Sequence, residues 1–443
     1  MNNLHQHAIN IFQAGIHAAN PYYAVQQYIK LNNNTIELGH DDTHKRTGDW
    51  STIHLIAFGK AALSMITAAQ DIIPKHLLIN KPIVVTNYEN VSAENTLEII
   101  GAGHPLPDNN GLQAAQKIAK EVIQARQGEL VLVLISGGGS ALIPYPVNSI
   151  SLQEKIITTQ LLLASGASIN EINCVRKHLS QLKGGGLAKL AYPADVHALI
   201  LSDVLGDEVS AIASGTTVAD NSTFSDAICV LKTKGLWHNV PLSVRSYLQD
   251  GEQGLVAETP KASDPVFANT DYHLIGSNTL SVNAMRDAAE LAGFAVEVID
   301  YALCGEAKQA AETLVAIAKT RCEQGINKPL ALLAGGETTV TLTGTGLGGR
   351  NQEMSLAFAI AAQKQALTGN WLFLSGGTDG RDGPTDAAGG IIDNNSLSLI
   401  NNAEQLLLNN DSYHALKQAN ALLITGATGT NVADLQILLL LPN

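Results

Sequence analysis

Glycine-rich loops that directly follow short apolar runs carry the residues best suited to bind an anion. Ser136-Gly137-Gly138-Gly139-Ser140 follows the run 130–135, and Gly59-Lys60 follows the run 54–58. Backbone N–H groups of such a loop can surround an anion at a strand end, and a lysine in the next helical turn adds charge. Residues 136–140 lack the Gly-Lys-Ser/Thr of a Walker loop and the G-x-G-x-x-G spacing of a dinucleotide fingerprint. A ligand-free turn and a surface lysine are the alternatives.

A second group of basic residues precedes another glycine segment. Arg176-Lys177-His178 leads into Lys183-Gly184-Gly185-Gly186. Neighbouring side chains on a helix point in different directions, so no more than one or two of these three can face a ligand. We select Lys177 as the binding residue of this segment.

The densest motif lies in the second half of the chain. Gly335-Gly336-Glu337-Thr338 is followed by a glycine-rich stretch that ends at Gly349-Arg350-Asn351. An arginine at the start of a helix presents a planar set of N–H donors that matches a carboxylate or a phosphate. Arg350 is therefore a candidate catalytic residue, and Glu337, Thr338 and Asn351 are candidate binding residues.

Acidic residues that could hold a cation gather in the segment 378–386. Asp379, Asp382 and Asp386 offer the oxygen ligands that a hard cation prefers, although Asp-Gly turns also form without metal, so both interpretations stay open. We select Asp379 and Asp382 as metal ligands. Asp203, which follows the apolar run 197–201, is a further candidate for metal binding or for a general base, whereas for His104, before a proline, a turn role is favoured.

The elements that position these loops follow from one repeated pattern, in which a short apolar run ends in glycine or a small polar residue before a helical stretch. This pattern is typical of the βα unit of an α/β fold. Strands that are apolar on both faces lie in sheets covered by helices on both sides, and ligands bind at the carboxyl ends of such strands. We therefore predict strands at 54–58, 130–135, 197–201, 330–333, 371–374 and 422–424.

Length and composition limit the class of protein. A chain of 443 residues with 45% hydrophobic and 15% charged residues is expected to fold into more than one globular domain. A polar stretch at 250–265 interrupts the pattern, so we predict a Rossmann-like α/β domain over 1–250, a junction over 251–270 and an α/β domain over 271–443.

The formal net charge of −13 argues against nucleic acid and anionic membranes as partners. The first 31 residues lack the basic start and continuous apolar core of a signal peptide, and no apolar run reaches the roughly 18 residues of a membrane span. Four widely spaced cysteines form no metal or redox motif. We expect a reduced, cytoplasmic protein.

Taken in order, these motifs resemble the type-2 glycerate kinase family, whose members have often been labelled hydroxypyruvate reductases. The resemblance spans nearly the whole chain. The segments that carry it are Phe58-Gly59-Lys60-Ala61, Gly103-His104-Pro105, 135–140, 175–180 with 183–186, Leu201-Ser202-Asp203-Val204, 335–338, 348–353, and 377–380 with 383–386.

The resemblance implies two three-layer α/β/α domains with an active-site cleft between them, and an ATP- and Mg²⁺-dependent kinase that converts D-glycerate to 2-phosphoglycerate. Lys60 and Arg350 match residues regarded as central to the family's site. We assign Lys60 to charge stabilisation at the reacting centre, residues 136–140 to phosphate or substrate binding, and Arg350 to the glycerate carboxylate or the phosphates. Phosphoryl transfer depends mainly on such positioning and charge stabilisation.

Two other functions are consistent with parts of the sequence. An NAD(P)H-dependent hydroxypyruvate reductase would need a dinucleotide site, and no strand is followed by the G-x-G-x-x-G fingerprint with an acidic residue roughly 20 positions later. A sensor that binds a hydroxy acid without turnover would not need both Lys60 and Arg350. The sequence leaves a homo-oligomer open.

Overall fold

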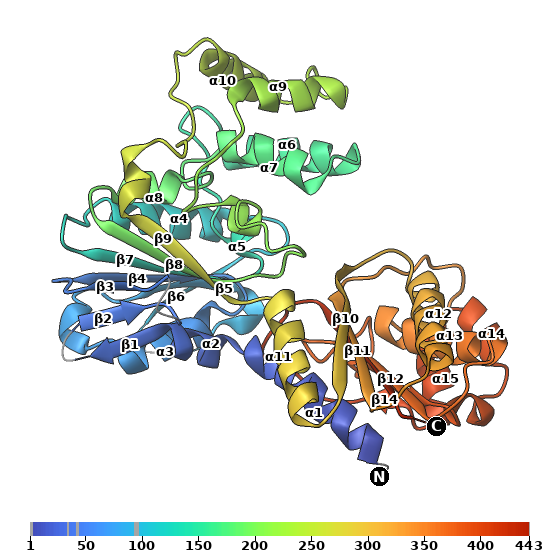
Figure 1. Ribbon diagram of the computed structural model, residues 1–443. Coiled ribbons are helices and arrows are strands. Elements are labelled where there is room, and N and C mark those ends of the chain that lie inside the picture. Colours follow the sequence, from blue (N-terminus) through green and yellow to red (C-terminus); the bar gives the residue numbers. More distant parts are fainter. Residues whose placement is uncertain (1–2, 33–34, 41–43, 93–96, 443) are drawn as a thin grey trace. The chain divides into compact units, whose positions relative to one another are not determined.

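The computed structural model describes residues 3–32, 35–40, 44–92 and 97–442 (Figure 1). The chain forms two compact units, each of which is described by itself. One comprises Pro21–Val204 and Glu208–Ile275, and we call it the parallel-sheet unit. The other comprises Met1–Asn20, Leu205–Asp207 and Gly276–Asn443, and we call it the mixed-sheet unit.

This division differs in two ways from the expected domains 1–250 and 271–443. The expected junction, 251–270, lies inside the parallel-sheet unit, and the first twenty residues belong to the mixed-sheet unit. The physical reason is packing: α1 (Asn3–Ala18) buries Leu4, Ala8, Ile11 and Phe12 in the same core as Val282 and Met285 of α11 (Asn278–Leu291).

The parallel-sheet unit is built on a sheet with strand order β6-β5-β4-β7-β8-β9. Its strands are β4 (Ile53–Phe58), β5 (Ile83–Asn87), β6 (Glu98–Ala102), β7 (Leu130–Ile135), β8 (Asp195–Leu201) and β9 (Thr270–Gly276). Strands β4 to β8 pair in parallel, and Phe58 lies beside Ile135, which lies beside Ile200. The loops after β4, β7 and β8 therefore start at one edge of the sheet.

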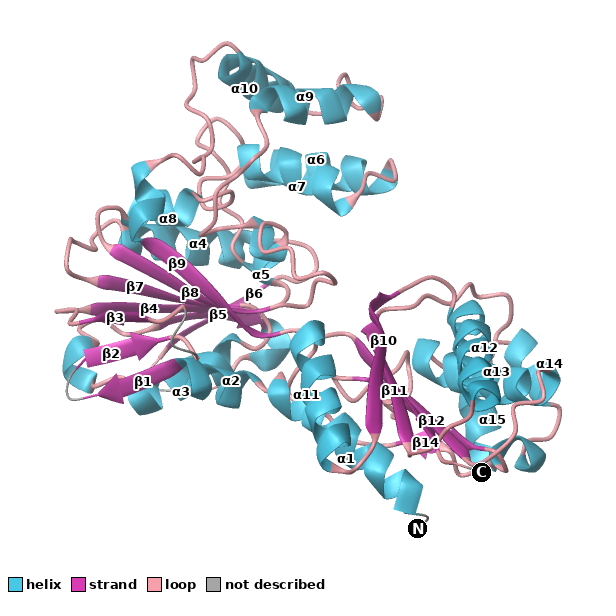
Figure 2. Cartoon of the chain, viewed as in Figure 1, coloured by secondary structure: helices cyan, strands magenta, loops and turns pink. Residues whose placement is uncertain are grey.

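Helices cover both faces of this sheet. In Figure 2, α2 (Pro21–Tyr28) and α3 (Ala62–Ile72) lie on one face, while α4 (Asn109–Val122), α5 (Gly139–Leu142) and α8 (Gly186–Ala191) lie on the other. The helices α6 (Leu152–Ala164), α7 (Ile169–His178), α9 (Phe224–Thr233) and α10 (Leu242–Glu252) form a separate core around Phe224 and Leu248. A small antiparallel sheet contains β1 (Ile29–Asn32), β2 (Thr35–Leu38) and β3 (Arg46–Gly48). The unit's 3₁₀ helices are η1 (Lys75–Leu77), η2 (Tyr88–Asn90), η3 (Ile212–Ser214) and η4 (Pro265–Asn269).

The mixed-sheet unit has the strand order β10-β11-β15-β12-β13-β14. The strands are β10 (Ala295–Leu303), β11 (Leu330–Gly336), β12 (Trp371–Gly377), β13 (Gly389–Asp393), β14 (Leu422–Leu423) and β15 (Asp434–Leu440). Only β10 and β11 pair in parallel among the pairs described, whereas β15 is antiparallel to both of its neighbours, β11 and β12. The repeated βα pattern did not reveal this reversed central strand.

The mixed sheet is also covered on both faces. Helices α1 and α11 pack on one face, and α12 (Ala307–Gln324) and α13 (Arg350–Lys364) on the other (Figure 2). Smaller elements beside α13 are η5 (Ser396–Leu399), α14 (Ala403–Leu408) and α15 (Ser412–Gln418). The expected α/β class with two sheet-bearing domains is confirmed. No helix in the described ranges is long and apolar enough to cross a membrane.

Candidate functional site

The glycine loop 136–140 joins β7 to α5 and is held tightly against the loop after β4. Ser136 N donates to Phe58 O at 3.1 Å, and Lys60 N donates to Gly137 O at 2.9 Å. The hydroxyl of Ser136 accepts a hydrogen bond from Ala61 N at 3.0 Å. Because β4 and β7 end in register, these bonds hold the loop after β4 and the loop after β7 beside each other. Both loops were predicted from the sequence to bind an anion.

Lys60, His104 and Asp203 surround this loop. A Cβ atom on Gly137 would meet the carboxylate of Asp203, and one on Gly138 would lie 3.0 Å from His104 and 3.5 Å from Lys60 Cε. Gly138 also has a φ of 83°, which a larger residue would adopt only with strain. The Lys60 side chain is exposed, so it can reach a ligand. The structure thus brings Lys60, Asp203 and residues 136–140 together.

His104 was expected to be a turn residue, yet its ring lies at the glycine loop. Burial, and then the charge of Lys60, lower the pKa of His104, while Glu89 acts in the opposite direction. A neutral imidazole at pH 7 can accept a proton. The geometry therefore adds His104 to the groups that could act as a base here.

Ser140, at the end of the glycine loop, receives two cationic donors. Arg176 Nη2 donates to Ser140 Oγ at 2.5 Å, and Lys183 Nζ donates to Ser140 Oγ at 2.7 Å and to Ser140 O at 2.9 Å. The same hydroxyl lies 3.0 Å from Ser214 Oγ, which donates to Asn173 Oδ1 at 3.0 Å. With its oxygen accepting from both cations, Ser140 donates its own proton to Ser214.

The turn that supplies Ser214 has an unusual backbone. Ala213, Ser214 and Gly215 have φ values of 49°, 56° and 64°. A left-handed conformation costs roughly 1–2 kcal/mol for each residue with a Cβ atom, so two such residues in succession are maintained only where surrounding contacts require them. The carbonyls of Ser214 and Gly215 accept from Gly184 N and Gly185 N at 3.0 and 2.8 Å, which ties this turn to the second glycine segment.

Lys177 does not contact the glycine loop, whereas its neighbour Arg176 does. Lys177 Nζ lies 3.3 Å from Asp220 Oδ1, and both side chains are buried. The two basic residues diverge because consecutive side chains on a helix differ in direction by about 100°. Lys177 instead lines a cavity of about 250 Å³, together with Asn173 and Asp220. Its role as a ligand-binding residue stays a prediction.

In the mixed-sheet unit, Arg350 is engaged by acids. Its Nε donates to Asp434 Oδ2 at 2.6 Å and its Nη2 to Asp434 Oδ1 at 3.0 Å, while Nη1 lies 2.7 Å from Glu337 Oε1. Burial disfavours the charge on Arg350, but the hydrogen bonds and charge of Asp434 raise its pKa. Burial raises the pKa of Asp434 to about 6, against the effect of Arg350. The planar face expected to hold a substrate anion is thus occupied by Asp434.

Asp382 caps α13. Its Oδ1 accepts from Asn351 N and Nδ2 at 3.2 and 3.3 Å, and its Oδ2 accepts from Gln352 N and Nε2 at 2.8 and 3.0 Å. Asp379 Oδ1 accepts from Arg381 N at 2.9 Å. Among the described residues no group of three or more His, Cys, Asp or Glu could hold a metal ion. The assignment of Asp379 and Asp382 as metal ligands stays a prediction, and the contacts of Asp382 are those of a capping residue.

The remaining predicted residues of this unit lie close to Arg350. Asn351 Oδ1 accepts from Ser375 Oγ at 2.6 Å, so this side chain links α13 to β12. Glu337 is half-exposed and pairs with Arg350. The hydroxyl of Thr338 is buried without a hydrogen-bond partner among the described residues.

Sequence reasoning missed Asp434 and Arg176. The signal for Asp434 was a single acid at the start of the apolar run 435–441, where a charge is unexpected. For Arg176 the signal was present, but the choice between adjacent basic residues depends on helix rotation, which the sequence does not provide.

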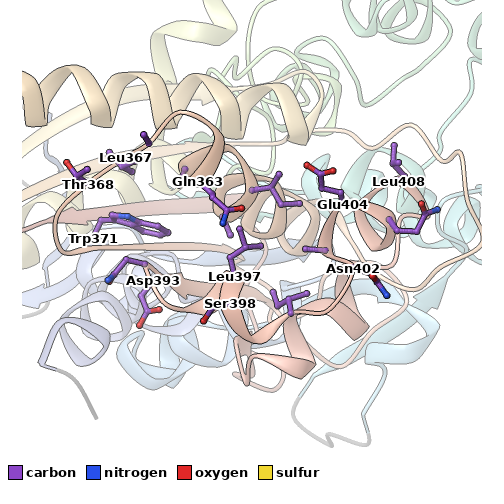
Figure 3. Close-up of a pocket in the computed structure, with 18 residues that line it drawn as sticks. Gln363, Leu367, Thr368, Trp371, Asp393, Leu397, Ser398, Asn402, Glu404 and Leu408 are labelled. Carbon is purple, nitrogen blue, oxygen red and sulfur yellow. The ribbon is translucent and has the colours of Figure 1, made fainter.

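A cavity of about 770 Å³ in the mixed-sheet unit contains none of the predicted site residues. Figure 3 shows Gln363, Trp371 and Leu397 around it, at the end of α13 opposite to Arg350. Gln363 is thirteen positions after Arg350, which corresponds to roughly 20 Å of helix. This cavity is distinct from the loops that carry the candidate chemistry.

The chain thus contains two α/β units with glycine-rich loops at strand ends, and one of these loops lies beside an exposed lysine and a carboxylate. This combination is typical of α/β proteins that bind small molecules. Residues 7–249 match the family described as "Domain of unknown function (DUF4147)", and residues 330–434 match the MOFRL family.

Named relatives identify the family more closely. The chain is 43% identical over 390 residues to the D-glycerate 2-kinase of Thermotoga maritima, which covers 86% of this chain and 89% of the relative. It is 40% identical to the glycerate 2-kinase of Pyrococcus horikoshii, over 95% of this chain and 94% of the relative. A solved structure of a glycerate kinase from Thermotoga maritima matches with a TM-score of 0.85 and 40% identity, over 98% of this chain and 99% of that chain. The chain belongs to the glycerate 2-kinase family, as the resemblance implied.

Proposed function

We propose that this protein is an ATP-dependent glycerate 2-kinase. It transfers the γ-phosphoryl group of ATP to the 2-hydroxyl of D-glycerate and yields ADP and 2-phosphoglycerate. The observation that carries the proposal is the identity of 43% to a protein named D-glycerate 2-kinase, with Lys60 and the loop 136–140 in contact with each other. In this reaction the bond from the γ-phosphorus to the bridging oxygen of ADP breaks, the bond to O2 forms, and the O2 proton passes to a base.

The residues of the parallel-sheet unit are suited to these tasks. Backbone N–H groups of the loop 137–140 are our candidates to bind phosphate or substrate oxygens, apart from Gly139 N, which donates to Ser136 O at 3.3 Å. Lys60 stabilises negative charge that develops on the transferred group. Asp203, beside Gly137, is our candidate for the base, and neutral His104 is the second. Lys177, Glu337, Thr338, Asn351 and Arg350 remain candidate binding or catalytic residues.

Magnesium is proposed as the metal that accompanies ATP, since Mg²⁺ binds through substrate phosphates and one or two carboxylates. Asp379 is a candidate for such a carboxylate, and Asp203 is the alternative candidate if it does not serve as the base. Asp382 fits this role poorly, because each of its oxygens already accepts two hydrogen bonds. Activity should vanish with EDTA and return with Mg²⁺.

One relative, from Agrobacterium vitis, is named a putative hydroxypyruvate reductase and is 39% identical over 394 residues. A coupled assay separates the two activities. Purified protein with ATP, Mg²⁺ and D-glycerate should form ADP and 2-phosphoglycerate, whereas NADH consumption with hydroxypyruvate and no ADP would contradict the proposal.

A cytoplasmic location is also proposed, supported by four cysteines without a disulfide in the described chain.

A further inference from the structure

Three basic side chains lie together behind the glycine loop of the parallel-sheet unit, and we call Lys155, Arg176 and Lys183 the cation cluster. Lys155 and Lys183 are 5% and 1% exposed. Lys155 Nζ donates to Leu179 O at 2.8 Å, at the end of α7, while Arg176 and Lys183 donate to Ser140. The cluster is therefore a buried part of the structure that contacts the loop.

Among the described residues no carboxylate forms an ion pair with the cation cluster, and none contributes to the pKa shifts of its three members. Burial, and then the charge of Arg176, lower the pKa values of Lys155 and Lys183 well below their usual range, and burial lowers that of Arg176 to about 10. Placing cations in the interior without an acid is costly, so proteins rarely keep such groups without a use. A bound anion would supply the missing charge.

A cavity of about 130 Å³ opens onto this cluster. Its lining includes the polar residues Ser140, Lys155 and Arg176 and the apolar residues Leu152, Ile156 and Leu163. Among the described residues the Arg176 side chain makes a single hydrogen bond, through Nη2, so other donors of its guanidinium are available. The volume suits an acid of a few carbon atoms and is well below the roughly 300–1,000 Å³ of sites for larger ligands.

We infer that this cavity holds the carboxylate of the acceptor acid, with the free guanidinium donors of Arg176 as its direct partners. Ser140 and Lys183 are positioning residues, because Ser140 Oγ accepts from both Arg176 and Lys183 and thereby fixes the guanidinium. The inference rests on the proposed kinase function and names the acceptor subsite within it. Its ligand class is the short 2-hydroxy acid.

The spacing of the glycine loop gives the inference a consequence for the position of phosphorylation. Gly138, beside Lys60, and Ser140 are two residues apart, so their Cα atoms are separated by no more than about 7.6 Å. In a 2-hydroxy acid the reacting oxygen is on the carbon next to the carboxylate, whereas O3 of glycerate is one carbon further. A carboxylate anchored at Arg176 keeps O2 one carbon closer to the anchor than O3, so the inference predicts phosphorylation at O2.

Arg176→Gln tests the inference by two independent measurements. Binding of D-glycerate in the presence of ADP, measured by calorimetry, should weaken at least tenfold, and KM for glycerate should rise by a similar factor with a smaller change in kcat. The melting temperature of the ligand-free variant should equal or exceed that of the wild type, because an unpaired cation has been removed. A purely structural Arg176 would instead lower the melting temperature and leave glycerate affinity unchanged, and that result would overturn the inference.

Two further variants keep the test decisive. Arg126→Gln removes an exposed arginine of the same unit and should leave binding and KM unchanged. Lys183→Met keeps most of the side-chain volume and should show the same pattern as Arg176→Gln. It therefore tests the inference if the Arg176→Gln variant does not fold. A wild-type protein that binds glycerate through Arg176 but forms no ADP would contradict the kinase proposal alone. Full kinase activity with unaltered KM in both variants would contradict the subsite alone.

Discussion

The basic groups behind the glycine loop of the parallel-sheet unit and the arginine after the glycine-rich stretch of the mixed-sheet unit are held in opposite ways. In the parallel-sheet unit, Lys155 and Lys183 are buried without an acidic partner in the described chain. In the mixed-sheet unit, Arg350 is held by both oxygens of Asp434 and by Glu337. Unpaired cations are suited to receive an anionic ligand, while a cation already paired with acids organises its own unit. The comparison therefore favours ligand binding as the role of the first set and positioning as the role of the second, and the following predictions test it.

Strand direction accounts for this difference. At the carboxyl edge of the parallel strands β4, β7 and β8, every loop follows a strand end. In the mixed sheet β15 runs the other way, so its first residue, Asp434, lies beside Gly336 of β11 and Gly377 of β12. The antiparallel direction of β15 thus places the carboxylate of Asp434 at the edge of the sheet where the glycine loops begin.

The largest effect should come from Lys60→Ala. If Lys60 stabilises charge at the reacting centre, kcat should fall about 100- to 1,000-fold with nucleotide binding partly retained. Lys120→Ala, at an exposed position on α4, is the control and should behave as the wild type. Steady-state kinetics with an ADP-coupled assay measure both, and a near-normal kcat for Lys60→Ala would remove this residue from the reaction.

Asp434→Asn should destabilise the mixed-sheet unit, since it leaves Arg350 without its buried acid. Breaking a fully buried ion pair costs about 3–5 kcal/mol, and we expect about 2–4 kcal/mol because the Arg350 side chain is 33% exposed. Hydrogen exchange in β11, β12 and β15 would report the loss. Glu337→Gln, at a half-exposed partner of the same arginine, should cost less than about 1 kcal/mol; equal effects would contradict the distinction between the two acids.

Arg350→Lys keeps the charge but loses the paired hydrogen bonds to Asp434. Losing one charge-assisted bond should lower the stability of the mixed-sheet unit by roughly 1.5–3 kcal/mol, since both bonds are internal to it. If Arg350 acts by positioning, KM for glycerate should stay close to that of the wild type. Unchanged stability together with a raised KM for glycerate would instead point to direct contact between Arg350 and the substrate.

The smallest effect concerns another base without an acid in the parallel-sheet unit, His197. Its Nε2 lies 2.9 Å from His273 Nδ1, and burial, then the charge of His273, lower its pKa from 6.5 to about 3. In the unfolded chain this histidine therefore binds a proton below about pH 6.5, whereas in the folded chain it stays neutral down to about pH 3. The free energy of unfolding should therefore be about 2 kcal/mol lower at pH 5 than above pH 6.5. Denaturant unfolding of His197→Gln should show a weaker dependence on pH between 7 and 5 than the wild type; identical slopes would show that this histidine is not responsible.

Much of the parallel-sheet unit could be predicted because its signals are local. The runs 130–135 and 197–201 coincide with β7 and most of β8, and the glycine loop follows directly. The partner of Arg350 could not be predicted in the same way, since Asp434 is 84 positions away and its placement depends on the reversed direction of β15. The placement of α1 in the mixed-sheet unit could not be predicted for a similar reason, because it depends on packing with α11.

The central place of β15 has a consequence for synthesis on the ribosome. When translation has passed Ala433, every other strand of the mixed sheet has been made, yet β11 and β12 still lack the strand that separates them. Each then presents an unpaired edge of backbone donors and acceptors, the kind of edge that attracts other chains. The strands β4 to β8 of the other unit are complete more than two hundred residues earlier. The nascent chain is therefore most prone to aggregation, and most in need of a chaperone, during the last step of its elongation through residue 440.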